Sequence, residues 1–204
     1  MSSMISFKKI TNGILKENCY VFTSKHKEAI IFDPGGDFEL IKSYITKNSL
    51  KPLAILNTHA HFDHIGAVSQ LKKYFSIPFY LHSQDFKLLK SANIYLKFFM
   101  EKNFIEIPNV DIFIDDLSCF FLGEFEIKTI FTPGHTNGSV SYIIDNKMIC
   151  GDIFVENKIG RTDLPGGNKI LLLETLTKIK KLPHNLEILP GHGNNSFLSE
   201  QVKK

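Results

Sequence analysis

The stretch THAHFDH, residues 58–64, places four side chains that commonly bind metal ions within six residues. It follows an apolar run and leads into a helical pattern, so it lies where a strand ends. Because residues two apart share a face of a strand, His59 and His61 can reach one point. Asp63 and His64 come after the chain changes direction and should face that point from the other side. The stretch therefore predicts ligands for two neighbouring metal ions.

The remaining sequence alternates strand and helix patterns. One strand begins at Pro52 and leads to His59, and the other strands are predicted at residues 5–10, 14–23, 28–32, 78–81, 111–114, 119–122, 124–131, 140–144, 147–150 and 186–189. Helices are predicted at residues 37–48, 64–74 and 168–182, as one or two helices covering the site at 83–104, and at the C-terminus. Strands interleaved with helices indicate a layered α/β fold.

Three further residues of ligand type, His135, Asp152 and His192, follow predicted strand ends beside Gly or Pro, as His59 does. Loops at one end of the sheets carry the chemistry of layered folds, so we expect these residues to converge. A lone HxH pair is weak evidence, because surface histidine pairs are common. The pattern HxHxDH together with three more candidate ligands is strong evidence for a metal site.

The composition is that of a folded globular protein, with 204 residues, 43% hydrophobic and 22% charged. Such a length favours one domain. The 24 basic and 21 acidic residues leave a net charge of +3, which gives no indication of nucleic-acid binding. No apolar run is long enough to span a membrane, and the N-terminus lacks a signal-peptide pattern. We therefore expect a cytoplasmic protein with a small-molecule substrate; the oligomeric state is left open.

Cys19, Cys119 and Cys150 each lie in an apolar, strand-like run and show no CxxC spacing. We expect all three to be buried thiols in a reducing compartment rather than a disulfide framework. His26 and His184 are predicted at the surface. His82 follows a strand, and its place relative to the site is left open.

The set Asp33, THAHFDH (58–64), PGHT (133–136), GD (151–152) and PGHG (190–193) resembles the metallo-β-lactamase superfamily. The order and approximate spacing match over nearly the whole chain. The resemblance implies a four-layer αβ/βα sandwich, with residues 1–204 forming a single hydrolase domain. It also implies a pair of metal ions at one edge of the two sheets.

Carried over by motif, the resemblance implies seven ligands. His59, His61 and His135 would hold the first ion, Asp63, His64 and His192 the second, and Asp152 would bridge them. Imidazole and carboxylate ligands suit two divalent ions, with zinc the first choice and iron or manganese the alternatives. Cys150 is expected in the core rather than among the ligands.

Two such ions about 3.5–4 Å apart can hold and deprotonate a water molecule between them. The resulting metal-bound hydroxide would attack a carbonyl carbon, and the family suggests that Asp63 orients this nucleophile. Asp33 has two possible roles. It either accepts a hydrogen bond from a ligand histidine and so fixes its tautomer, or it forms the turn before Pro34.

The loop IGRTDLPGG, residues 159–167, resembles that of the hydroxyacylglutathione hydrolases (glyoxalase II) and their short bacterial relatives. The resemblance implies that Arg161 binds an anionic part of the substrate; the alternative is a structural pair with Asp163. The larger enzymes carry a glutathione-binding extension, whereas this chain ends about twelve residues after His192. Hydrolysis of a small thioester, such as a hydroxyacylglutathione, is the first hypothesis.

Four alternatives remain open. A persulfide dioxygenase on the same scaffold would hold a single iron and consume oxygen. A nuclease would need a basic RNA-binding arm, which the sequence does not show. A lactonase would hydrolyse a different carbonyl substrate. A non-enzymatic metal-binding module would be expected to lose ligands, whereas the ligand set here is full.

Overall fold

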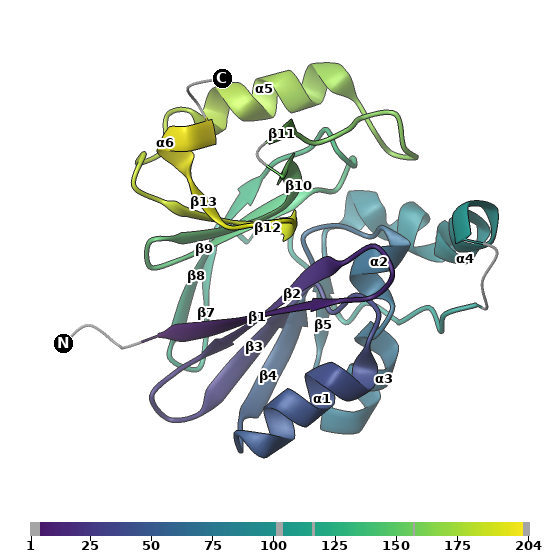
Figure 1. Ribbon diagram of the computed structural model, residues 1–204, viewed down its shortest axis with the longest axis vertical. Coiled ribbons are helices and arrows are strands. Elements are labelled where there is room, and N and C mark those ends of the chain that lie inside the picture. Colours follow the sequence, from purple (N-terminus) through teal and green to yellow (C-terminus); the bar gives the residue numbers. More distant parts are fainter. Residues whose placement is uncertain (1–4, 101–103, 116, 157, 202–204) are drawn as a thin grey trace.

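The computed structural model describes residues 5–100, 104–115, 117–156 and 158–201. Its strands pair in the order β6-β5-β4-β3-β2-β12-β10-β9-β8-β7. The path turns over where β2 pairs with β12 through Glu17 and His192, so that two layers of strands face each other (Figure 1). Helices cover the outer side of both layers. This is the four-layer αβ/βα sandwich expected from the sequence.

The first layer contains the N-terminal strands. They are β1 (Ser6–Asn12), β2 (Glu17–Thr23), β3 (Glu28–Phe32), β4 (Lys51–Leu56), β5 (Phe79–Leu81) and β6 (Ile112–Phe113). Strands β3 to β6 run parallel to one another, and the helices between them cross over on one side. These helices are α1 (Phe38–Lys47), α2 (Phe62–Ile65), α3 (Val68–Phe75), the 3₁₀ turn η1 (Ser83–Asp85) and α4 (Phe86–Met100).

The second layer contains the C-terminal strands. They are β7 (Cys119–Leu122), β8 (Phe125–Phe131), β9 (Val140–Ile144), β10 (Lys147–Val155), β11 (Lys158–Ile159), β12 (Glu187–His192) and β13 (Ser196–Phe197). Strands β7 to β10 form an antiparallel meander, and β10 runs parallel to β12. Helices α5 (Lys169–Ile179) and α6 (Leu198–Gln201) lie on the outer side of this layer (Figure 1).

Three apolar clusters separate the four layers. The central cluster fills the space between the strand layers, with Phe32 of β3 against Tyr142 of β9 at 5.2 Å between ring centroids. A second cluster joins the first layer to α1, α3 and α4, and a third joins the second layer to α5 and α6. Burial of these side chains provides the main driving force for the fold and fixes the strand ends that carry the site.

The predicted helix at residues 64–74 is wrong in one respect, because the structure divides it into α2 and α3. The break lies at Gly66 and Ala67. A Cβ atom on Gly66 would collide with the carbonyl oxygen of Gly35, so the chain needs glycine to approach the neighbouring loop there. In the predicted helical segment 83–104, a 3₁₀ turn precedes α4, and residues 101–103 lie outside the described residues.

Two further expectations differ from the structure. Asp152 and His192 do not follow strand ends, since β10 continues to Val155 and β12 ends at His192 itself. Asp152 instead follows Gly151, which has a φ of +52°. The pairing of β10 with β12 shifts register at Gly151, and this irregularity redirects the strand at Asp152. Cys19 and Cys150 are buried as expected, but Cys119 is exposed, because it lies on β7 at the edge of the pairing order.

Within the described part of the chain, no helix has the length and apolar character needed to cross a bilayer.

Candidate metal centre

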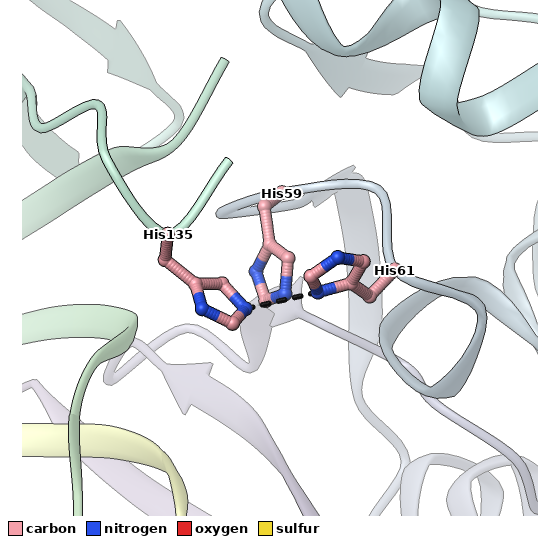
Figure 2. Close-up of side chains that lie close together, drawn as sticks. All are labelled: His59, His61 and His135. Atoms are coloured by element: carbon pink, nitrogen blue, oxygen red, sulfur yellow. Dashed lines mark hydrogen bonds between the residues drawn. The ribbon is translucent and has the colours of Figure 1, made fainter. Parts of the chain in front are cut away.

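His59, His61 and His135 meet where the two strand layers come together (Figure 2). The loop after β4 carries the first two, and the turn after β8 carries the third. The three ring centroids lie 4.6 to 4.9 Å apart. Nε2 of His135 is 2.9 Å from Nδ1 of His61, and the buried Nε2 of His59 has no hydrogen-bond partner among the described residues. The three side chains thus direct ring nitrogens at one point.

Asp63, His64 and His192 form a second group beside the first. The short helix α2 supplies Asp63 and His64, and the end of β12 supplies His192. Oδ2 of Asp63 lies 3.2 Å from Nε2 of His192 and 3.9 Å from Nε2 of His64. The buried Nε2 of His64 also has no hydrogen-bond partner in the described part of the chain.

The carboxylate of Asp152 lies between the two groups. Its Oδ1 is 3.5 Å from Nε2 of His64, in the second group. Its Oδ2 is 3.6 Å from Nε2 of His135 in the first group and 3.6 Å from Nε2 of His192 in the second. Oδ1 is buried and lacks a hydrogen-bond partner among the described residues. Asp152 is therefore the carboxylate that can serve both groups.

Each of the five histidines has its other ring nitrogen next to an acceptor of the protein. Side-chain oxygens face two of the rings: Thr58 Oγ1 lies 3.0 Å from Nδ1 of His59, and Asp33 Oδ2 lies 3.1 Å from Nδ1 of His64. Backbone carbonyl oxygens face the other three: that of Arg161 lies 2.8 Å from Nδ1 of His135, that of Leu15 lies 3.1 Å from Nδ1 of His192, and that of Pro165 lies 3.4 Å from Nε2 of His61. A carbonyl or carboxylate acceptor requires N–H on that side of the ring, which leaves a lone pair on the other. This arrangement, with an acceptor behind each ring, is the one found for metal-binding histidines.

Asp33 supports two of these rings. It accepts hydrogen bonds from the backbone N–H of Thr58 at 2.7 Å and from the Thr58 hydroxyl at 2.6 Å, besides its contact with His64. The Thr58 oxygen in turn lies next to Nδ1 of His59. Of the two roles expected for Asp33, these contacts favour the orienting one. Asp33 holds His64 directly and His59 through the Thr58 hydroxyl.

The buried carboxylate of Asp85 joins the two loops that carry the first group. It accepts hydrogen bonds from the N–H of Ala60 at 2.9 Å, the N–H of Gly138 at 2.7 Å and the hydroxyl of Thr136 at 2.8 Å. Ala60 lies between the first two candidate ligands, and Thr136 follows the third. Sequence analysis missed Asp85, because its partners are 25 to 53 residues away and it belongs to no recognisable motif.

A second buried carboxyl, that of Glu17, lies beneath the site and was also missed. Burial raises the pKa of Glu17 well above its ordinary value. The Asn12 amide donates to its Oε2 at 2.9 Å, while its Oε1 lies 4.0 Å from Nδ1 of His64. Glu17 follows a hairpin turn, and the sequence pattern there indicates only a strand.

The protein environment lowers the pKa values of two histidines of the first group and raises those of the histidines of the second group. Burial lowers the pKa of His59 well below its ordinary value and that of His61 to about 4. Burial acts in the same direction on His64, but the charges of Asp152 and Asp63 outweigh it and raise the pKa of His64 well above the ordinary value. The pKa of Asp152 is lowered, because the charge of His64 outweighs the effect of burial. His59 and His61 are thus neutral at pH 7, as metal ligands must be.

The residues of the two groups fit a pair of metal ions. Five imidazoles direct a ring nitrogen inward, and two carboxylates lie between and beside them. Three buried polar atoms at the centre lack a hydrogen-bond partner among the described residues: His59 Nε2, His64 Nε2 and Asp152 Oδ1. Unpaired buried polar atoms are costly, so their gathering at one place indicates an absent partner. Asp33 also lies within reach of His59 and His64, but both of its oxygens already accept hydrogen bonds from Thr58.

A cavity of about 600 Å³ opens onto this centre, with His61, Asp63, Asp152 and His192 in its wall. Helix α4 and residues 155–156 and 158–165 form much of the remaining wall. Arg161 lines the cavity, but its guanidinium makes two hydrogen bonds of 2.7 Å with Asp163, and the pair is exposed. The alternative structural pairing of Arg161 is therefore present, and it leaves the residue at the cavity rim.

The other residues considered from the sequence lie elsewhere. His26 and His184 are exposed, as expected, and His26 pairs with Glu124. His82 is buried and stacks on Phe131 outside the cavity wall. Cys150 packs in the cluster beneath α5 and does not join the candidate ligands, as expected.

Comparisons with known proteins identify relatives of the whole chain. The family model described as the metallo-beta-lactamase superfamily matches residues 12–192. A "Probable metallo-hydrolase YqgX" of Bacillus subtilis is 37% identical over 201 residues, which cover 97% of this chain and 95% of the relative. The "Hydroxyacylglutathione hydrolase GloC" of Haemophilus influenzae is 30% identical over 197 residues, which cover 92% of this chain and 91% of the relative.

A solved structure gives the same result for the fold. The crystal structure of the BLEG-1 B3 metallo-beta-lactamase superposes with a TM-score of 0.92 and 37% sequence identity. The superposition covers 98% of this chain and 97% of that one. The resemblance seen in the sequence motifs is thus confirmed over nearly the full length of both chains.

Proposed function

Because the chain belongs to the metallo-β-lactamase superfamily, we propose that this metal-dependent hydrolase cleaves a small thioester at a centre of two divalent ions. Hydrolysis adds water across the C–S bond and yields a carboxylic acid and a thiol. The observation that carries the proposal is the position of Asp152, whose two oxygens face the two groups of candidate ligands. A carboxylate at that place can serve an ion in each group at once.

In this proposal His59, His61 and His135 would hold one ion, Asp63, His64 and His192 would hold the other, and Asp152 could serve both. When bound, such a pair would supply activation of water at neutral pH and polarisation of the substrate carbonyl. Zinc is our first choice, and the nitrogen and oxygen donors are equally compatible with iron or manganese.

The chain's own residues have distinct roles in the proposed reaction. Asp63 lines the cavity and, ionised, can accept a hydrogen bond from the attacking water and orient it toward the carbonyl. The charge of His64 and the hydrogen bond from His192 outweigh burial and lower the pKa of Asp63, so this acceptor stays ionised. Arg161, at the cavity rim, can bind an anionic part of the leaving group.

Thioester hydrolysis is favoured over the other reactions of the superfamily by two observations. GloC is named for a hydroxyacylglutathione, which is a thioester, and it matches this chain over nearly its whole length. The Gly-rich loop that resembles the one in hydroxyacylglutathione hydrolases lines the cavity beside the candidate ligands through Ile159, Gly160, Arg161, Leu164 and Pro165. The persulfide dioxygenase alternative needs one iron, whereas the second group here offers a further set of three donors.

The deciding experiment measures the initial rate of S-D-lactoylglutathione and S-acetyl thioester hydrolysis by the metal-loaded protein. We expect turnover with two ions bound per chain, and its loss in His59→Ala together with loss of metal. His184→Ala, which changes an exposed histidine outside the site, is the matched control and should keep both its thioester turnover and its two bound ions. Thioester turnover that survives removal of all metal would overturn the proposal.

The likeness to BLEG-1 favours a second candidate, β-lactam hydrolysis. The same assay format with a chromogenic cephalosporin tests it. Metal-dependent cephalosporin turnover that exceeds thioester turnover would replace the first proposal by this one.

A further inference from the structure

The cavity beside the candidate metal centre has an apolar wall that the proposed reaction does not require. On one side, α4 contributes Ala92, Tyr95 and Phe99, and on the other lie Val155, Ile159 and Leu164. The cavity volume of about 600 Å³ lies in the usual range for small-molecule sites. It exceeds what the acyl group of a two- or three-carbon acid would fill.

Few charged side chains line the wall. They are Glu156, Lys158 and Arg161, all exposed, besides the candidate ligands. Arg161 is held at the rim by its two hydrogen bonds with Asp163, where it can meet an anionic end of the substrate. The part of the substrate between this rim and the scissile bond would face mostly hydrocarbon.

Phe99 and Ile159 are half exposed, at 49% and 56%, although both are large apolar residues. Both line the cavity, so a substrate lying between them would remove apolar surface from water on each side. Burial of such surface is favourable by about 0.8 kcal/mol per methylene, which corresponds to about fourfold in affinity.

From this wall we propose that the substrate carries an uncharged apolar group of several carbons, aliphatic or aromatic, beside the scissile thioester. The inference rests on the proposed function and names its substrate class. The apolar group lies between α4 on one side and Val155, Ile159 and Leu164 on the other, while the thioester faces Asp63 and Asp152. It can belong to the acyl part or to the thiol part of the thioester, and both share the same chemistry.

The test uses two series of thioesters with the metal-loaded protein. The first varies the acyl group from acetyl to butyryl and hexanoyl on one small thiol, N-acetylcysteamine. The second keeps the acetyl group and lengthens an alkyl thiol. We expect kcat/KM to rise by about fourfold per methylene in one of the series, which identifies the apolar part. Values that stay flat or fall in both series would overturn the inference.

Two variants of α4 locate the effect. Phe99→Ala should lower the hexanoyl-to-acetyl ratio of kcat/KM, or the matching ratio in the thiol series, by about tenfold. Ile94→Ala is the matched control, since Ile94 is 68% exposed on the same helix and does not line the cavity. Phe98 is unsuitable as a control, because its ring lies 5.2 Å from that of Phe99. An equal loss in both variants would assign the effect to the helix rather than to the wall and would count against the inference.

Direct binding separates the inference from the proposed function. Ketone analogues, in which a methylene replaces the thioester sulfur, are titrated into the metal-loaded protein by calorimetry. Tighter binding of the longer analogue, reversed by Phe99→Ala, would support the apolar site even if thioesters were not turned over. Metal-dependent turnover of acetyl thioesters without any gain from longer chains would leave the proposed function standing and overturn the inference alone.

Discussion

Asp33 and His64 are 31 residues apart in the sequence, yet Oδ2 of Asp33 lies 3.1 Å from Nδ1 of His64. The backbone of Asp33 adopts a φ of +46°, a left-handed conformation that is uncommon for residues other than glycine. The hydrogen bonds that Thr58 donates to both carboxylate oxygens hold the side chain in place. Asp33 is thus a fixed acceptor behind one ring of the candidate centre.

This relationship predicts the effect of Asp33→Asn. The amide keeps one acceptor oxygen but places N–H groups against either His64 or Thr58, so at least one hydrogen bond is lost. We expect metal affinity, measured by competition with a chelator, to fall about 10- to 100-fold. Asp37→Asn is the control, because Asp37 caps α1 through the N–H of Leu40 and asparagine caps helices equally well. Unchanged affinity in Asp33→Asn would reduce Asp33 to a turn residue.

Asp85 gives a prediction about stability. Its carboxylate is buried and accepts three hydrogen bonds that join the loops of the first group. In Asp85→Asn the amide turns N–H groups toward at least one of these donors, leaving buried polar groups unpaired. We expect the free energy of unfolding of the metal-free protein to fall by about 2–4 kcal/mol, measured by urea denaturation.

Asp145→Asn is the control for Asp85, since it makes the same chemical change at an exposed turn. Asp145 has a φ of +52°, which asparagine also tolerates, so its stability should stay within about 0.5 kcal/mol of the original. If Asp85→Asn were as stable as this control, Asp85 would not hold the two loops together.

The sequence alone predicts the candidate ligands because they are concentrated in short motifs. Residues 58–64 contain four of them, and the others lie beside Gly or Pro at positions that the fold brings together. The strand and helix patterns likewise predict a layered α/β fold, and the resemblance carried by the motifs implies that it has four layers. These features depend on local sequence patterns, which can be read from a single sequence.

What sequence analysis missed depends on contacts between distant segments. Asp85 and Glu17 look like ordinary polar residues until the fold places them under the site. The break at Gly66 comes from the approach of Gly35, which no local pattern reveals. Cys119 was assigned to the core because its run is apolar, but the position of β7 at an edge of the pairing order leaves it exposed.

The pKa values predict that the two groups take up metal with different pH dependence. In the metal-free protein the pKa of His64 is raised by Asp152 and Asp63, and that of His192 by its hydrogen bond with Asp63, both against the effect of burial. A raised pKa means that protons must leave before a metal can bind, so affinity at this group should rise with pH above about 6.5. His61, with a pKa of about 4, is already neutral there.

Calorimetric titration with zinc from pH 6 to 8, in buffers of different ionisation enthalpy, measures this directly. We expect one ion to bind with little proton release and the other to release protons, more of them at pH 6 than at pH 8. Equal proton release at both steps would contradict the assignment of the raised pKa values to the second group.

Arg161 can be tested through its partner. We expect Arg161→Ala to raise KM for thioesters with an anionic thiol part, such as lactoylglutathione, and to leave kcat near its original value. Asp163→Asn removes the charge that neutralises Arg161 and should lower the same KM. The free energy of unfolding should change little in either variant, because solvent screens an exposed ion pair. A KM that is the same in both variants would make the Arg161–Asp163 pair structural.

The division of the candidate ligands between the two strand layers has a consequence for assembly. The N-terminal layer carries His59, His61, Asp63 and His64, while His135, Asp152 and His192 come with the C-terminal layer. Neither half of the chain therefore contains a complete set for either ion. Metal uptake requires both halves to have docked, and its binding energy adds to the apolar contact that joins them. The metal content of a preparation then measures the fraction of molecules whose two halves have docked correctly.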